Sequence, residues 1–345
     1  CSLNAGDANV IIGCKAGCSL TSGNCNVNIG ALAGAKLVSQ CCGVNIGQCA
    51  GYSDFPGDSN VFIGSCAGWR GGCNGSNIAI GRGSGQSMKS AGGTVVIGDY
   101  AGRCVQGACN VAIGKFALRG NGTDVDDNAA ACNVALGYQA GKLINTGTSN
   151  VFLGKNAACA ITSGSSNIAL GEDAMGCGTV TGNYNISLGF RAGCKLTSGS
   201  CNTFIGFCAG RNNTSASQNT FIGRYAGAGN TSGGGNLVIG DNAAVNSVFF
   251  QNIIAIGCCS AAFAFGSSDG NGGIAIGTCA ARFATVNVLA IGANSGCQTT
   301  GAQNSFIGVN AGLKNTSGKY NTFFGHSAGS VNVSGCCNTF IGRGA

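Results

Sequence analysis

The sequence is poor in charge, in proline and in histidine. Charged residues make up 8% of its 345 positions, and it holds one Pro, one Trp and one His. Without a recurring carboxylate pair or a second histidine, it lacks the convergent acid and base groups that enzyme active sites need. Its 18 basic residues form no Lys/Arg stripe, so nucleic-acid binding is not expected. We therefore expect a protein that is not an enzyme and uses no cofactor or metal.

Long apolar runs are also missing. No stretch reaches the roughly 18 consecutive apolar residues of a transmembrane helix, although 44% of the residues are hydrophobic. Sustained helical periodicity is absent as well. Glycine, at 64 positions, opposes helix by about 1 kcal/mol per residue relative to Ala. These absences predict an all-β chain without a membrane span.

What the chain has instead is one phrase repeated from end to end. The segment "NTFIGFCAG" (202–210) is followed by "NTFIGRYAG" (219–227). We call the glycine of each Ile-Gly, Leu-Gly or, once, Phe-Gly pair the marker glycine; of the nineteen spacings between twenty markers, thirteen are 17 residues. Such a period is typical of solenoids, in which each coil buries its apolar face only by stacking on its neighbours.

Each position of the repeat has its own chemistry. Asn dominates four residues before the marker, where it suits a corner and can stack into amide ladders. Ala or Ser stands three residues after every marker. The positions just before the marker alternate with the two-residue period of a strand. We expect the residue before the marker to face inward and the residue two before it to face outward.

These columns predict an all-β fold, a parallel β-solenoid of about twenty 17-residue coils. The prediction covers residues 1–345 as a single domain. Two marker spacings are much longer than the rest, at 23 and 20 residues. We expect corner insertions there, near 119–131 and 264–273.

Several repeats resemble known fibre proteins. "NIAIG" (77–81), "NVAIG" (110–114) and "NIALG" (167–171) resemble the head repeats of trimeric autotransporter adhesins. "NVALGYQAG" (133–141) is similar to repeats of phage and other viral tail-fibre proteins and of bacterial surface proteins. The resemblance covers nearly the whole chain. It implies a surface or virion fibre, commonly trimeric.

The 23 cysteines follow the repeat. Neighbouring coils about 4.8 Å apart fall within the Cα to Cα range of a disulfide, so we predict disulfide staples and an extracellular, cell-surface or virion location. The alternatives are buried free thiols and a metal site, the latter disfavoured by the single His and the absence of paired C-x-x-C motifs. The candidate pairs are Cys1 with Cys18, Cys25 with Cys42, Cys49 with Cys66, Cys109 with Cys132, Cys177 with Cys194, and Cys259 with Cys279.

The column two residues before the marker is apolar in seventeen of twenty repeats. As an outward stripe it would mark lateral self-association, with a trimer favoured by the resemblance; a cross-section that buries this face is the alternative. The chain opens and stops within a coil, so a head-to-tail filament is a second expected mode of assembly. The phenylalanines of the stripe are Phe62, Phe152, Phe204, Phe221, Phe306, Phe323 and Phe340.

Four sequons share one position, ten residues before a marker: Asn213, Asn230, Asn315 and Asn332. They are candidate glycosylation sites, although chance matches are as frequent in a chain so rich in Asn, Ser and Thr. The expected function is that of a structural subunit of an extracellular or virion fibre, self-assembling and stapled by disulfides. The alternative is a surface adhesin or tail-fibre module that binds a receptor or glycan.

Overall fold

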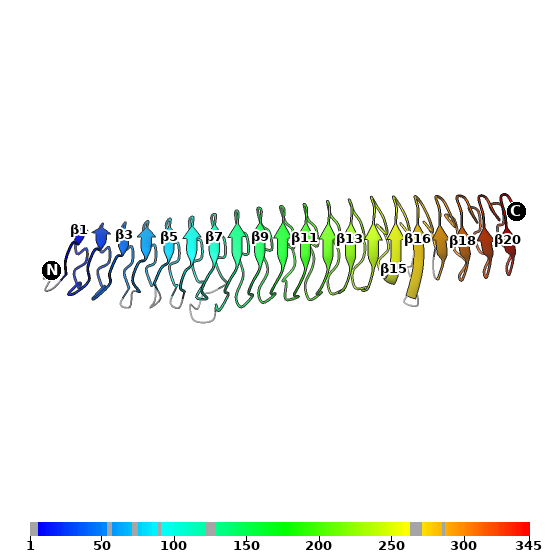
Figure 1. The fold of residues 1–345 in the computed structure, drawn as a ribbon. Helices are drawn as coiled ribbons and strands as arrows, with labels where there is room; N and C mark the ends of the chain where they lie inside the picture. The colour runs from blue at the N-terminus through cyan, green and yellow to red at the C-terminus, as the bar shows by residue number, and fades with distance from the viewer. Residues whose placement is uncertain are drawn as a thin grey trace. The chain divides into compact units, whose positions relative to one another are not determined.

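The computed structural model describes residues 6–53, 57–70, 75–88, 91–121, 128–262, 271–284 and 287–345. Within these residues every regular element is a β-strand, and no helix is present. The chain divides into two compact units, Cys1–Thr181 and Gly182–Ala345, and each is a parallel β-solenoid (Figure 1). The fold class is therefore confirmed. That the two units form one domain stays a prediction.

In the first unit the described residues hold ten strands, each parallel to the next and in register with it. Each coil contributes one strand, and this strand forms backbone hydrogen bonds with the strands of the neighbouring coils. The strands are β1 (Val10–Ile12), β2 (Val27–Ile29), β3 (Val44–Ile46), β4 (Val61–Ile63), β5 (Ile78–Ile80), β6 (Val95–Ile97), β7 (Val111–Ile113), β8 (Val134–Leu136), β9 (Val151–Leu153) and β10 (Ile168–Leu170).

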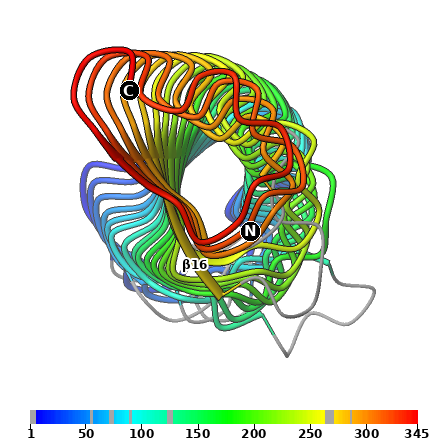
Figure 2. The same cartoon turned by 90° about the vertical axis from the view of Figure 1, so that its right-hand side faces the viewer.

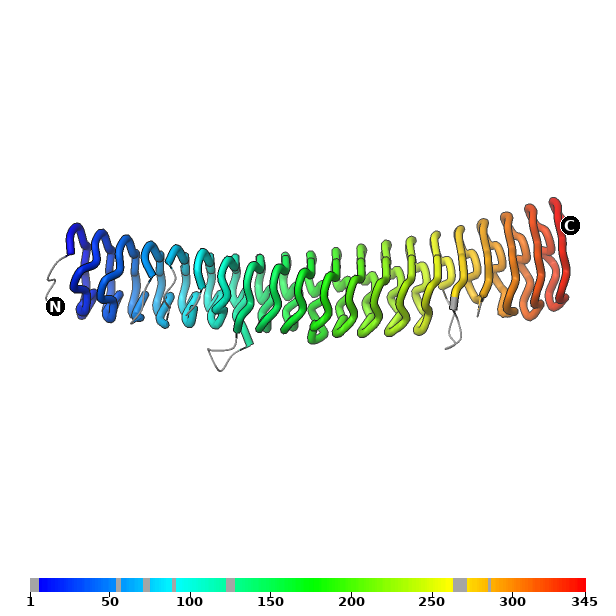
Figure 3. Tube along the Cα trace, turned by 60° about the horizontal axis from the view of Figure 1, so that its bottom comes forward, coloured from blue at the N-terminus to red at the C-terminus, as the bar shows by residue number. Residues whose placement is uncertain are grey.

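The described part of the second unit repeats this arrangement, again with parallel, in-register pairing. Within each unit the coils follow one another as evenly spaced turns (Figure 3). The strands are β11 (Ile186–Leu188), β12 (Thr203–Ile205), β13 (Thr220–Ile222), β14 (Leu237–Ile239), β15 (Gln251–Ile256), β16 (Asn271–Ile276), β17 (Leu289–Ile291), β18 (Ser305–Ile307), β19 (Thr322–Phe324) and β20 (Thr339–Ile341).

The marker glycine closes each strand because no other residue fits there. At Gly81 the backbone has φ of 123°, and a Cβ would lie 2.7 Å from the carbonyl oxygen of Gly98 in the next coil. Side chains rarely adopt this φ, and the contact is shorter than carbon and oxygen tolerate. The repeat of glycine every 17 residues thus fixes the pitch of the solenoid.

The faces of the strands are opposite to our expectation. In β12 the middle residue, Phe204, is fully buried, whereas Thr203 and Ile205 are half-buried. In β9, Phe152 is buried, while Val151 and Leu153 are 38% and 47% exposed. Because side chains alternate along a strand, an error of one residue exchanges the two faces. The residue before the marker faces outward, and the residue two before it faces the core.

The predicted outward phenylalanine stripe is therefore wrong, and its members belong to the core. Phe204 and Phe221 stack with ring centroids 5.4 Å apart, and Phe306 and Phe323 at 5.3 Å. A strand of three residues supplies one inward column, and several of the largest fully buried side chains of the described residues lie there. Phe62, Phe152, Phe204, Phe221, Phe306 and Phe323 are buried, and Phe340 is half-buried.

The rest of the coil encloses this column. In Figure 2 the orange and red coils of the second unit are closed loops with the strand on one side. Ala209 and Ala226, three residues after their markers, are completely buried. Small side chains at this corner leave room for the stacked rings.

The asparagine ladder expected from the sequence is confirmed. Asn202 donates from its backbone N and from Nδ2 to Oδ1 of Asn185, both at 3.0 Å. Asn219 does the same to Asn202, at 3.1 Å each. These side chains are fully buried, so the ladder supplies partners for polar groups that water cannot reach.

Candidate functional site

The strands present an unusually apolar surface on their outward side. We call the first and third residues of β1 to β10 the outer face; all of them are Val, Ile or Leu. Ile12 and Ile113 on this face are 58% and 40% exposed. Ten strands of three residues cover on the order of 450 Å² at about 3.3 Å per residue and about 4.8 Å per strand. Patches of roughly 300–600 Å² on a monomer are often functional.

The corresponding side of the second unit is more polar. The last residues of β11 to β20 remain Ile, Leu or Phe, but the first residue is Thr in β12, β13, β19 and β20 and Ser in β18. The most continuous apolar surface of the described residues is therefore the outer face of the first unit.

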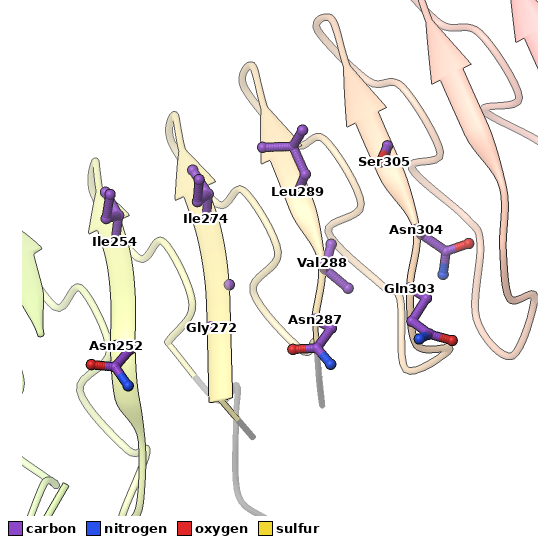
Figure 4. A pocket seen from close by; sticks show the side chains of 11 residues that line it. Asn252, Ile254, Gly272, Ile274, Asn287, Val288, Leu289, Gln303, Asn304 and Ser305 are labelled. Atoms are coloured by element: carbon purple, nitrogen blue, oxygen red, sulfur yellow. The ribbon is translucent and has the colours of Figure 1, made fainter. Parts of the chain in front are cut away.

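A shallow hollow of about 580 Å³ lies on the outward side of β15 to β18 in the second unit. Figure 4 shows Ile254, Ile274 and Leu289 in a row on neighbouring strands, with Asn252 and Asn287 toward the starts of the strands. The residues that line the hollow include no titratable side chain. It can bind through apolar contact and amide hydrogen bonds, and it supplies no acid, base or nucleophile.

The structure contains one of the predicted disulfides, between Cys177 and Cys194. The marker spacing around Cys177, from Gly171 to Gly189, is 18 residues. Counted from the preceding marker, Cys177 is therefore one position later than Cys194.

The prediction of disulfides in the other described pairs is wrong, because these cysteines are free thiols. Cys25 and Cys42 lie at the same position of consecutive coils, with the same φ of 57° and with Cys42 N bonded to Asn24 O; equivalent stacked positions give their Cα–Cβ bonds the same direction. Parallel Cβ atoms stay about one strand spacing apart, roughly 4.8 Å, whereas a disulfide needs about 3.5–4.5 Å. The free thiols are Cys18, Cys25, Cys42, Cys49, Cys66, Cys109, Cys132, Cys259 and Cys279; Cys1 lies outside the described residues.

Several thiols are nevertheless perturbed by their surroundings. Burial raises the pKa of Cys208, which lies in the second unit, above its ordinary value. Burial and a hydrogen bond with the Cys66 thiol raise the pKa of Cys49. No cluster of three or more His, Cys, Asp or Glu side chains among the described residues could hold a metal ion.

The sequon asparagines lie inside the coil. Asn213, Asn230 and Asn315 are completely buried, and Asn332 is half-buried. The first three are therefore not glycosylation sites of the folded chain, because an oligosaccharide needs an exposed amide. Asn315 instead donates from Nδ2 to Thr299 Oγ1 at 3.1 Å and accepts from Asn332 at 2.8 Å.

Sequence reasoning missed the outer face, although a signal was present. Phenylalanine is frequent two residues before the marker, whereas Thr203, Thr220, Thr322 and Thr339 share the column three before it. A column that accepts both Val and Thr is better suited to solvent than one that accepts Phe and Ala. This contrast would have assigned the faces correctly.

Comparison with known proteins assigns no family. No protein-family model matches the chain, and no curated protein sequence matches it. In the part of the chain that the structure describes, no helix is long and apolar enough to cross a membrane. The function has to be argued from the surfaces described above.

Proposed function

We propose that the chain is a structural, self-assembling subunit of a fibre outside the cell or on a virion. The observation that supports this is the outer face of the first unit, on which only Val, Ile and Leu stand. Leaving such a surface in water costs roughly 25 cal/mol per Å² of apolar area. Association of two such faces removes that cost.

The partner that fits best is a second copy of the same chain. The outer face repeats at the pitch of the coils, and a second copy repeats at the same pitch. Ridges of Val and Ile on one copy can therefore settle between those on the other along the whole face, as inner faces do when sheets pack about 10 Å apart. No charged side chain stands on the face, so none becomes buried and unpaired.

The stacked coil supports a mechanical role. Each strand bonds to the next, and the amide ladder and the glycine contacts repeat with the coil. Because the described hollow and outer face hold no titratable group, assembly explains them better than chemistry does.

Sedimentation velocity with reductant present tests this proposal. Ile80→Lys, Ile97→Lys and Ile113→Lys together place three charges on the outer face, since these residues end β5, β6 and β7. The matched control is Ser22→Lys, Ser39→Lys and Thr146→Lys, at exposed corners of the same unit. We expect wild type and control to associate and the face variant to sediment as a monomer. A monomeric wild type, or a face variant that still associates, would refute the proposal.

A second candidate is an adhesin or tail-fibre module that binds a receptor or glycan. The hollow of the second unit favours it, because its amides and apolar floor suit an uncharged oligosaccharide. Titration calorimetry with neutral oligosaccharides tests this candidate. Binding that disappears in Ile274→Glu supports it, and the absence of heat with the wild type rejects it.

A further inference from the structure

A second surface lies at the corner that follows the strands of the first unit. Five basic side chains gather there, which we call the basic edge: Arg82, Arg103, Lys115, Arg119 and Lys142. Lys115 and Arg82 are exposed, and the other three are half-buried. This edge is separate from the outer face and plays no part in the proposed assembly.

Three of these side chains occupy the same position in consecutive coils. Arg103, Arg119 and Lys142 each lie five residues after a marker glycine. The coils are in register there, because Cys104 N donates to Arg119 O at 3.0 Å and Leu118 N donates to Ala140 O at 2.9 Å. Stacked positions repeat at about 4.8 Å, so the three cations form a straight row along the stack.

Aromatic rings hold the basic edge in place. The rings of Tyr100 and Phe116 stack with centroids 6.0 Å apart. The guanidinium of Arg103 lies 5.6 Å from the Tyr100 centroid, and that of Arg119 lies 5.6 Å from the Phe116 centroid. Such contacts orient a cation without neutralising it.

One carboxylate serves the edge. Asp99 accepts from Arg82 Nε at 2.8 Å and lies 3.6 Å from Lys115 Nζ. Arg103 donates to the neutral amide of Gln86 at 2.9 Å. Among the residues that the structure describes, Arg103, Arg119 and Lys142 have no carboxylate partner. Three like charges at this spacing repel one another, which an external anion would relieve.

We infer that the basic edge binds a linear acidic polysaccharide, whose uronate carboxylates meet the cations of the row. The protein offers one cation per coil along this row, which suits a polysaccharide that carries one carboxylate per sugar. A DNA duplex fits less well because its phosphates follow a helical path and leave a straight row. Single-stranded nucleic acid stacks its bases on open aromatic faces. Tyr100 and Phe116 cover each other and are covered by cations, whereas Tyr138, packed edge-on against Phe116, is 44% exposed, so single-stranded DNA is included in the test.

The test uses the full chain and immobilised polygalacturonate, with single-stranded DNA and heparin as competing probes. The edge variant is Arg103→Gln, Arg119→Gln and Lys142→Gln. The control, Lys195→Gln, Arg211→Gln and Lys314→Gln, removes three charges from the second unit. Since each exposed ion pair contributes up to a few-fold, we expect about a tenfold loss of polygalacturonate affinity in the edge variant and less than twofold in the control. Affinity should fall as salt rises.

Four results would overturn the inference. The first is no binding of polygalacturonate by the wild type, and the second is an equal loss in both variants, which would reflect net charge alone. The third is tighter binding of single-stranded DNA than of either polysaccharide. Asp124→Asn, Asp126→Asn and Asp127→Asn, which lie outside the described residues, provide a further check. If this variant gains more than tenfold in affinity, the edge is already covered by its own carboxylates and is not an open site.

Discussion

At the scale of single residues, the position seven after the marker holds a buried apolar side chain in some coils and a buried asparagine in others. It is Leu20, Leu37, Ile144, Ile161 and Leu196 in some coils and Asn213, Asn230 and Asn315 in others, all buried. Asn230 and Asn315 have hydrogen-bond partners. Within the described ranges, neither Nδ2 nor Oδ1 of Asn213 has a hydrogen-bond partner. A buried, unpaired amide is unfavourable by about 1–3 kcal/mol.

We therefore predict that Asn213→Leu stabilises the chain by about 1–3 kcal/mol, since it removes two unpaired polar atoms at a position where the neighbouring coil has Leu196. The matched control is Asn315→Leu, which abandons the bonds of Asn315 to Thr299 and Gly318 and should destabilise. Thermal unfolding followed by circular dichroism measures both. Destabilisation by Asn213→Leu would show that this amide has a partner in solution.

The marker glycine gives a second residue-scale prediction. Gly81→Ala forces a Cβ against the Gly98 carbonyl at 2.7 Å, and we expect a loss of about 3 kcal/mol or more, since left-handed strain alone costs about 1–2 kcal/mol. Gly93→Ala is the control, because Gly93 has φ of 62° with open space around its Cβ position. Equal losses in the two variants, measured by urea unfolding, would mean that strain and not the contact between coils makes glycine necessary.

Buried thiols predict a loss of stability at alkaline pH. Burial raises the pKa of Cys104 above its ordinary value, so the folded chain holds this proton more tightly than the unfolded chain. The contribution of this thiol to the free energy of unfolding is fully present below the ordinary thiol pKa. It is lost as pH rises through the raised pKa of the folded chain. Melting temperature between about pH 8 and about pH 10, in reductant, should fall less steeply in Cys104→Ala than in wild type. Identical slopes would exclude this thiol as a source.

At the scale of elements, the disulfide between Cys177 and Cys194 closes a short loop. Joining Cys177 to Cys194 is worth about 3 kcal/mol in the chain-entropy picture for a loop of this size. We predict that Cys177→Ala with Cys194→Ala lowers the free energy of unfolding by about that amount and removes the effect of reductant on the melting temperature. A wild type that melts at the same temperature with and without reductant would contradict the assignment.

The position of each strand could be predicted from the sequence more readily than the direction in which its two faces point. The strand position and the amide ladder were predictable, because Gly recurs at one position of every period, Asn and Ala recur at one position of most periods, and each has one geometric use there. Which face points inward was not settled by the two-residue period, since alternation reads the same from either side. Phe204 and Thr203 decide it only when the sizes and polarities of whole columns are compared.

The predictions of further disulfides and of glycosylation were wrong for a related reason. A spacing of 17 residues establishes that Cys25 and Cys42 stack, but not that their Cβ atoms converge. The motif at Asn213 is local, whereas its burial depends on the coil around it. Asn213 and Leu196 occupy the same position in consecutive coils. A leucine at that position was the available sign in the sequence that Asn213 faces the core.

At the scale of the whole molecule, the proposed assembly and the inferred polysaccharide binding involve different surfaces of the first unit. The outer face is apolar and uncharged, while the basic edge lies at the following corner. Charges placed on the outer face should abolish association and leave polygalacturonate binding unchanged apart from loss of avidity. The edge variant should still associate, and sedimentation with both variants separates the two roles.

The measurement that tests self-association most directly is cryo-electron microscopy of the 345-residue chain in reductant. The account predicts copies that meet through β1 to β10, with Val and Ile side chains of one outer face packed on those of the other and with no sulfur bridges between copies. Single copies whose outer faces stay in solvent, or assemblies joined only at the corners, would contradict it.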